Sequence, residues 1–176
     1  MLWLLAIPLL LIVLAGLAVV GYYWYISRQL DSMMDELQQG LSRVRQELGE
    51  EYRLLDDLTD IAEGYMQHQR DELDRLGELS PDVGDTFSDL AETRERLLEL
   101  EIGFLESVQD YPELRDDTEF QSTLDRIAEK RYQRHEAIQQ YNDLAEEYND
   151  LVEDFPSRLV AEREGYSWVE RFRTAA

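Results

Sequence analysis

The first 27 residues of the chain carry no charged side chain, and Arg28 is the first charge. As a helix, the apolar run 2–25 would be about 36 Å long, against about 30 Å for the hydrocarbon core of a bilayer. Trp3 and the aromatic cluster 22–25 lie at its two ends, as membrane–water interfaces favour. A cleaved signal peptide would have basic residues before its apolar run, and none is present. We therefore expect an uncleaved transmembrane anchor at 1–27.

The distribution of basic residues around this run predicts its orientation. No Lys or Arg precedes the apolar segment, whereas Arg28, Arg43 and Arg45 follow it. Basic residues close to a span are retained on the cytoplasmic side. We expect a single-pass protein of the cell (inner) membrane whose soluble part is cytoplasmic.

The charge balance excludes several classes of function. There are 17 basic and 39 acidic side chains, for a net charge of −22, so a nucleic-acid binder with a basic face is not expected. The absence of Cys excludes disulfides and a thiol nucleophile, and two His cannot form a three-histidine metal site. Lys130 is the only Lys. Such a composition would suit a high-salt host or a simply solvated acidic surface, and both interpretations stay open.

Beyond the apolar run, prolines separate three long stretches with helical apolar spacing. They cover about 29–79, 83–108 and 116–155, and a short helix is expected at 157–164. Nothing between Tyr25 and Leu30 would end a helix, so the anchor can continue into the first stretch. The fold class we expect is all-α: an N-terminal transmembrane helix followed by an antiparallel bundle of three long helices plus a short C-terminal helix. The corresponding domains are 1–27, 28–164 and a tail at 165–176.

Each long stretch predicts a buried stripe. In the first stretch the stripe is Leu30, Met34, Leu37, Leu41, Val44, Leu48, Leu55, Leu58, Ala62 and Tyr65, with one slot occupied by Glu51. In the second it is Phe87, Leu90, Leu97, Leu98, Ile102, Leu105 and Val108. In the third it is Phe120, Leu124, Ile127, Ile138, Tyr141, Ala145, Tyr148, Val152 and Phe155. Arg131 and Arg134 interrupt the third stripe, where they can pair with carboxylates on a facing helix or extend to solvent.

No group of residues has the spacing of a known active site. His68 and His135 are isolated, and no glycine-rich phosphate loop or calcium loop is present. The abundant carboxylates are best interpreted as a solvated surface. We expect no catalytic residues, no cofactor and no metal.

A set of motifs near the C-terminus resembles the LemA family. These motifs are Tyr111-Pro112-Glu113-Leu114, Phe120, Tyr141-Asn142, Tyr148-Asn149, Phe155-Pro156, Leu159-Val160-Ala161 and Gly165-Tyr166. The two Tyr-Asn pairs and the Phe-Pro pair follow one another at intervals of seven residues. An apolar N-terminal segment leading into a long helix also matches the layout of that family. The basic, proline-containing stretch common in the family's first helix is replaced here by Arg53-Leu54-Leu55-Asp56-Asp57-Leu58.

The spacing of seven has its own physical meaning. Seven residues return to one helix face, so Tyr141, Tyr148 and Phe155 should line one seam. Asn142 and Asn149 would lie at the edge of that seam, where an amide can bond a facing backbone or side chain. The Phe155-Pro156 pair would then direct the chain out of the helix.

The resemblance implies a membrane-anchored helical bundle with no established catalytic residues. We expect a non-enzymatic adaptor or scaffold that contacts the bilayer through residues 2–25, with envelope or membrane-protein quality control as a setting. Its protein partner is unidentified; a membrane metallopeptidase or another membrane protein is implied by association in relatives. The alternative function is a self-assembling structural or membrane-organising homo-oligomer.

The tail differs from the rest of the soluble part in charge. Residues 157–176 hold four Arg and three Glu, whereas residues 28–156 are strongly acidic. The tail also carries Tyr166, Trp168 and Phe172, which could dock on a partner or on lipid. The alternative is that these rings fold back onto the chain's own helices.

Overall fold

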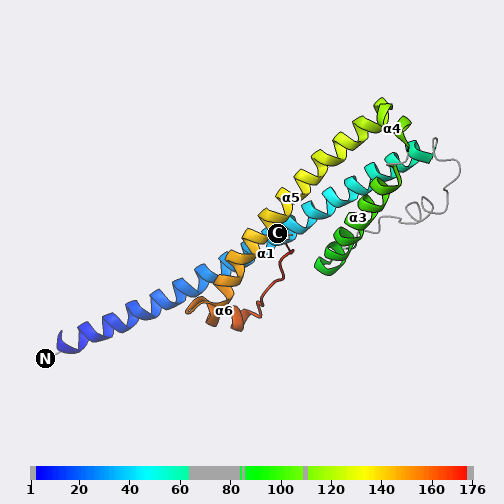
Figure 1. Cartoon of the computed structure of the whole chain (residues 1–176). Coiled ribbons are helices and arrows are strands. Elements are labelled where there is room, and N and C mark those ends of the chain that lie inside the picture. The colour runs from blue at the N-terminus through cyan, green and yellow to red at the C-terminus, as the bar shows by residue number, and fades with distance from the viewer. Residues whose placement is uncertain (1–2, 64–83, 85, 109–110, 174–176) are drawn as a thin grey trace. The chain divides into compact units, whose positions relative to one another are not determined.

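The computed structural model describes residues 3–63, 84, 86–108 and 111–173, and all regular elements in that part of the chain are helices. They are α1 (Trp3–Glu63), α3 (Phe87–Val108), α4 (Pro112–Asp116), α5 (Thr118–Glu153) and α6 (Ser157–Glu164) (Figure 1). The all-helical prediction is confirmed for these residues. The expected continuation of the first stretch to residue 79, with Tyr65 and His68, lies outside them.

Helix α1 has no break between the apolar run and the amphipathic stretch that follows it. It is the one helix in the described residues that is long and apolar enough to cross a membrane. Its large apolar side chains between residues 9 and 20 are exposed. No other part of the described chain covers them.

The chain divides into two compact units, and α1 and α5 contribute to both. Unit 1 comprises Met1–Gln38 and Asn142–Arg173, and unit 2 contains Gln39–Tyr141. Unit 1 buries the apolar side chains Ile26, Leu30, Met33, Leu37, Ala145, Tyr148, Val160, Ala161 and Phe172. Unit 2 buries Val44, Leu48, Tyr52, Leu54, Leu55, Leu58, Ala62, Leu90, Leu97, Phe104, Val108, Leu114, Phe120, Ile127, Ala137, Ile138 and Tyr141. In the first stripe, Met33 is therefore buried in place of the expected Met34.

The predicted stripe of α3 is wrong at Ile102 and Leu105, although its last residue, Val108, is buried. Ile102 and Leu105 are 60% and 45% exposed, whereas Glu101 and Phe104 are 6% and 1% exposed. Both sets follow steps of three and four residues, so spacing alone could not choose between them. The larger Phe104 ring is buried, with its centroid 6.3 Å from that of Phe120.

Two short signals set the boundaries of α5 and α6. The Oδ1 atom of Asp117 accepts hydrogen bonds from the backbone N–H groups of Glu119 and Phe120, both at 2.9 Å, and so caps the start of α5. The cap is thus Asp117, whereas Asp116 ends α4. Gly165 follows α6 with φ of 85°, a left-handed conformation that Gly adopts without strain.

The expected place of Phe155 in the buried seam is also corrected. Helix α5 ends at Glu153, and Phe155 precedes a cis peptide bond to Pro156 in the turn before α6. Its side chain is 81% exposed. Because the helix ends two residues earlier, the interval of seven no longer returns Phe155 to the face of Tyr148.

Candidate functional site

The residues of the family motif are divided between the two units. In unit 2, Leu114, Phe120 and Tyr141 are buried, and the Tyr141 ring stacks on Phe87 with centroids 6.0 Å apart. The Cβ of a side chain at Gly40 would lie 3.3 Å from Cδ2 of Tyr141, so this Gly permits a close approach of α1 to the ring. Tyr111 and Pro112 lie at the start of α4 and are not buried.

In unit 1, two side-chain amides hold the C-terminal tail. Asn149 Nδ2 donates to the Val169 carbonyl and Asn149 Oδ1 accepts from the Val169 N–H, both at 2.9 Å. Asn142 makes the same pair of bonds with Phe172, at 2.9 and 2.8 Å. Each amide therefore satisfies both backbone polar groups of one tail residue. We call Asn142 and Asn149 the amide clamp.

The spacing of the clamp fits an extended tail. Seven residues advance a helix by about 10.5 Å, and three extended residues span about 10 Å. The amides at 142 and 149 are seven apart, and the tail residues that they hold, 172 and 169, are three apart in the reverse order. The two Asn of the motif are thus placed for a non-helical segment that runs antiparallel to α5.

The clamp separates the three aromatic residues that the sequence proposed for docking. Phe172 is 4% exposed, so it belongs to the core of unit 1. Tyr166 donates a hydrogen bond from its hydroxyl to Asp31 of α1, which raises the pKa of Tyr166. Trp168 is 53% exposed. The three rings do not form one docking surface, and Trp168 is the member that remains on the outside.

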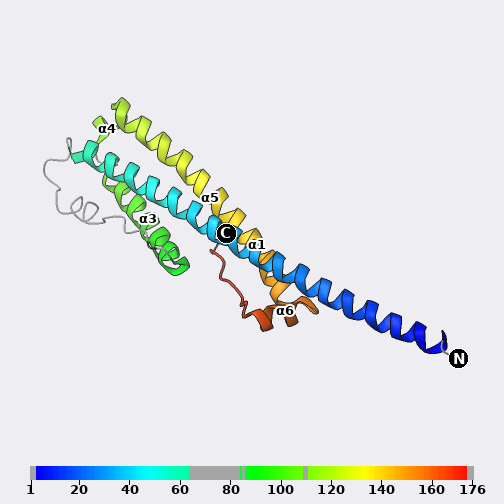
Figure 2. The ribbon, with the colours of Figure 1, turned by 180° about the vertical axis from the view of Figure 1, so that it is seen from behind.

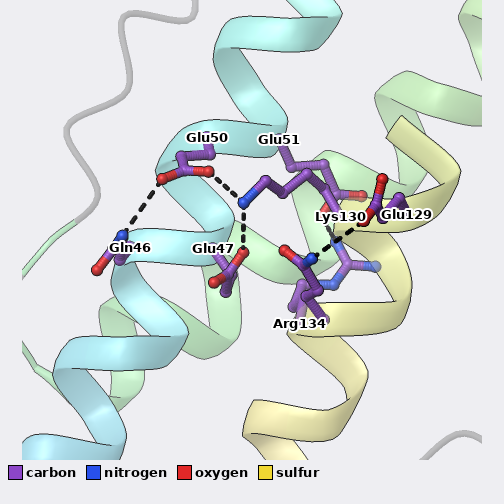
Figure 3. A network of polar contacts seen from close by, with 8 residues as sticks. Gln46, Glu47, Glu50, Glu51, Glu129, Lys130 and Arg134 are labelled. Atoms are coloured by element: carbon purple, nitrogen blue, oxygen red, sulfur yellow. Dashed lines mark hydrogen bonds and ion pairs between the residues drawn. The ribbon is translucent and has the colours of Figure 1, made fainter. Parts of the chain in front are cut away.

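Unit 2 contains a second polar arrangement, made of charges. Lys130 of α5 forms ion pairs with Glu47 and Glu50 of α1, and Arg134, one turn further along α5, pairs with Glu51 at 2.7 Å (Figure 3). Glu50 and Glu51 lie three and four residues after Glu47, and the two α5 cations are four apart, so each of these pairs lies along one side of its helix.

The inner part of this arrangement is buried. The side chain of Glu51 is fully buried, and those of Arg134 and Glu101 are 6% and 7% exposed. Arg131 pairs with Glu101 of α3 at 2.7 Å. Burial raises the pKa of Glu51 to about 7; Arg134 opposes this shift, and neighbouring Glu101 adds to it. We call Glu51, Glu101, Arg131 and Arg134 the buried charge cluster.

A cavity of about 390 Å³ adjoins this cluster. Its lining comes from α3 and α5 and consists of Arg94, Ala128, Arg131, Tyr132, Arg134, His135 and Ile138. Three of the seven lining residues are Arg, in a chain of net charge −22. Guanidinium groups bind carboxylates and phosphates through forked hydrogen bonds, so an oxygen-rich anionic group is the ligand that fits this lining.

Sequence reasoning found only part of this site. Glu51 was detectable because it occupies an apolar slot of its stripe, and Arg131 and Arg134 because they interrupt theirs. Glu101 was missed because the α3 stripe was assigned to the neighbouring face. Arg94 gave no signal, since one Arg on a predicted helix normally extends to solvent.

In the described residues, no group of three or more His, Cys, Asp or Glu is arranged to hold a metal ion. The expectation that the chain is not an enzyme stays a prediction.

No curated protein matches the sequence. The model of the LemA family matches residues 40–176, which is most of the chain. The chain therefore belongs to the LemA family.

Proposed function

We propose that this LemA-family chain is a non-enzymatic, single-pass scaffold, anchored in the cell membrane by residues 2–25, whose helices recruit a partner protein. The observation that carries the proposal is the continuity of α1 from Trp3 to Glu63. One helix holds both the apolar segment and the face on which α5 pairs its cations.

The arrangement that we propose for the soluble part is an antiparallel bundle of α1, α3 and α5. Support comes from pairs in unit 2, since Arg43 bonds Gln140 whereas Glu47 pairs with Lys130. Residue numbers rise along α1 as they fall along α5. Tyr52 of α1 also reaches the Thr93 carbonyl of α3.

The partner contact that we propose is the arginine-lined cavity. Arg131 and Arg134 already neutralise Glu101 and Glu51, whereas Arg94 makes no ion pair with any carboxylate in the described residues. An acidic group of a partner would complete the charge balance there. Membrane-protein quality control beside a membrane metallopeptidase, which the family resemblance implies, is the setting we propose.

Site-specific photo-cross-linking in intact cells tests this function. A benzophenone amino acid replaces Tyr132, whose side chain is 69% exposed at the cavity. We expect one discrete adduct, which Arg94→Glu removes and Arg96→Glu retains, because Arg96 is an exposed Arg of the same helix that does not line the cavity. An adduct equally strong in both charge-reversed variants would contradict recruitment through the cavity.

The orientation is tested separately. The chain has no Cys, so Ser122→Cys on the exposed surface of α5 introduces a single thiol. We expect a membrane-impermeant maleimide to label it only after cell lysis, as a cytoplasmic domain requires. Labelling of intact cells would place the helices on the other side.

One observation favours self-assembly as a second candidate function. Ile102 and Leu105 are exposed, three residues apart on α3, and therefore lie on one side of that helix. A second copy of the chain could cover them. Light scattering of the detergent-solubilised chain should then give a mass above one chain, and Ile102→Asp with Leu105→Asp should reduce it; a single-chain mass at both low and high salt would exclude this function.

A further inference from the structure

Three large apolar side chains of unit 1 lie exposed in and around α6. Phe155 is 81%, Leu159 58% and Trp168 53% exposed. Ser157, Val160 and Ala161 of the same helix are buried, so α6 packs one side inward and leaves Leu159 outside. Removing one large apolar side chain from water stabilises a protein by roughly 1.5–3 kcal/mol, so the exposure of these three side chains to water is unfavourable.

Contacts within unit 1 fix where α6 lies along α1. Glu164 accepts a hydrogen bond from the Tyr23 hydroxyl, and the Arg163 guanidinium lies 5.4 Å from the centre of the Tyr23 ring. Tyr166 is bonded to Asp31. Figures 1 and 2 both show α6 beside this part of α1. The end of α6 is thus level with the last turns of the apolar run and the first charged residues after it.

That level is where a bilayer interface would be. The helix rises about 12 Å from Tyr23 to Asp31, and the polar layer of each leaflet is about 5–8 Å thick. Tyr22, Trp24 and Tyr25 of α1 are exposed at the same level, as interfacial aromatic residues are. An α6 fixed to this turn has no freedom to leave the surface of a membrane that α1 crosses.

We propose that Phe155, Leu159 and Trp168 form a membrane-contact surface that inserts into the interface of the bilayer crossed by α1. This inference rests on the proposed membrane anchor. The occupant is lipid because the contacts of Glu164 and Arg163 with Tyr23 place the end of α6 at the level where the exposed apolar segment of α1 ends. The charge around it is also compatible, since residues 157–176 hold four Arg and three Glu in an otherwise strongly acidic chain.

The chain contains three Trp residues, at 3, 24 and 168, which provides a direct test. Trp3→Phe with Trp24→Phe leaves Trp168 as the sole Trp in the full chain. After reconstitution into phosphatidylcholine vesicles, we expect lipids brominated at acyl carbons 6 and 7 to reduce its fluorescence at least twofold. Lipids brominated deeper, at carbons 11 and 12, should reduce it less, because the ring lies in the interface.

A matched pair of variants separates insertion from proximity. Phe155→Asp with Leu159→Asp changes two exposed positions of the surface and should at least halve the quenching of Trp168. Thr118→Asp with Ser122→Asp adds the same two negative charges at two exposed positions of unit 2 and should leave the quenching unchanged.

The results that overturn the inference are distinct from those that overturn the anchor. A second background, Trp3→Phe with Trp168→Phe, reports on Trp24 in α1. Quenched Trp24 beside unquenched, acrylamide-accessible Trp168 places α6 in water and overturns the inference alone. If Trp168 is shielded only at high protein-to-lipid ratio, a second copy covers it and the inference is equally wrong. Unquenched Trp24 overturns the anchor, and the inference falls with it.

Discussion

The buried polar side chains of unit 1 are neutral, among them the amide of Asn149, whereas unit 2 also buries the charged side chains of Glu51, Glu101 and Arg134. In unit 1, Asn142 and Asn149 meet the backbone of the tail with both of their hydrogen-bonding groups. In unit 2, Glu51 and Arg134 meet as ions out of contact with solvent. An amide carries no net charge and does not titrate, so its hydrogen bonds do not depend on pH or salt, whereas the charge of a buried carboxylate depends on pH. The two units of one helical chain should therefore respond differently to the same change of conditions.

The difference also concerns specificity. A buried ion pair contributes little net stability, because desolvation offsets much of the Coulomb attraction, but breaking one partner is costly. We therefore expect the buried charge cluster to penalise a wrong register of α1, α3 and α5 more than it stabilises the right one. The amide clamp instead fixes a segment that has no secondary structure of its own, residues 166–173.

The largest effect is expected from Arg134→Met. This substitution leaves Glu51 buried without its guanidinium partner, and we expect a loss of about 3–5 kcal/mol at pH 8 in urea unfolding of the chain in detergent micelles. The loss should be smaller at pH 5, where Glu51 holds its proton. Arg134→Met together with Glu51→Leu removes both charges and should recover most of the stability. A double variant no more stable than the single one would show that the pair is not the main interaction of Arg134.

The second prediction concerns pH. The pKa of Glu51 is raised to about 7 from its usual 4.5 by burial, so the folded chain keeps a proton that the unfolded chain releases. The free energy of unfolding should consequently fall by on the order of 3 kcal/mol as pH rises from about 4.5 to about 7. Above pH 7 this contribution should not change further. Arg134, Arg131 and Glu101 surround the group. Glu51→Gln should remove this slope.

Hydrogen exchange gives the internal control for that experiment. The Val169 N–H is held by Asn149 in unit 1, whose amide does not titrate. After correction for intrinsic exchange, its local free energy of opening should not vary between pH 5 and 7. The contrast between the units would be contradicted if the free energy of unfolding of Glu51→Gln still fell with rising pH. It would also be contradicted if the local free energy of opening at Val169 fell with pH by an equal amount.

The elements of this fold other than the short helix α4 could be predicted from sequence, and the reasons are local. The continuity of α1, the 157–164 boundaries of α6 and the helical character of α3 and α5 follow from apolar spacing and from prolines and caps. The choice of face in α3 could not be predicted, because Ile102 and Phe104 both belong to runs with helical periodicity. Only the packing of Phe104 against Phe120 decides it.

The site could be predicted only where a residue breaks its own pattern. Glu51 and Arg134 each occupy an apolar slot, and for Arg134 the two alternatives were a carboxylate on a facing helix or extension to solvent. The amide clamp could be stated only as an Asn at the edge of a seam, since its partner is the backbone of the tail and a backbone has no sequence signature. The position of Phe155 depended on the length of α5, and helix ends are what periodicity defines least.

A third, smaller effect is expected in the clamp. Asn149→Ala removes two hydrogen bonds and leaves both backbone groups of Val169 to be solvated, so we expect a loss of about 1–3 kcal/mol, independent of pH and salt. The loss should appear as faster hydrogen exchange at Val169 and Phe172, with the amides of α3 unchanged. Asn149→Asp is the matched variant, because a carboxylate still accepts from the Val169 N–H but cannot donate to its carbonyl. If it were as stable as the natural chain, the donated bond would contribute nothing.

The smallest effect is expected from Tyr148→Phe. The Tyr148 side chain is fully buried, and its hydroxyl has no hydrogen-bond partner in the described residues. Burial raises the pKa of this hydroxyl, so it stays neutral and its removal should change stability by no more than about 0.5 kcal/mol or increase it slightly. Tyr52→Phe is the counterpart in unit 2, where the hydroxyl makes only a long bond of 3.5 Å to the Thr93 carbonyl. Urea unfolding of both variants compares the units at single hydroxyl groups. A loss above about 1 kcal/mol for Tyr148→Phe alone would mean that unit 1 also depends on a polar contact inside its core. The two units would then differ less than the amide clamp and the buried charge cluster suggest.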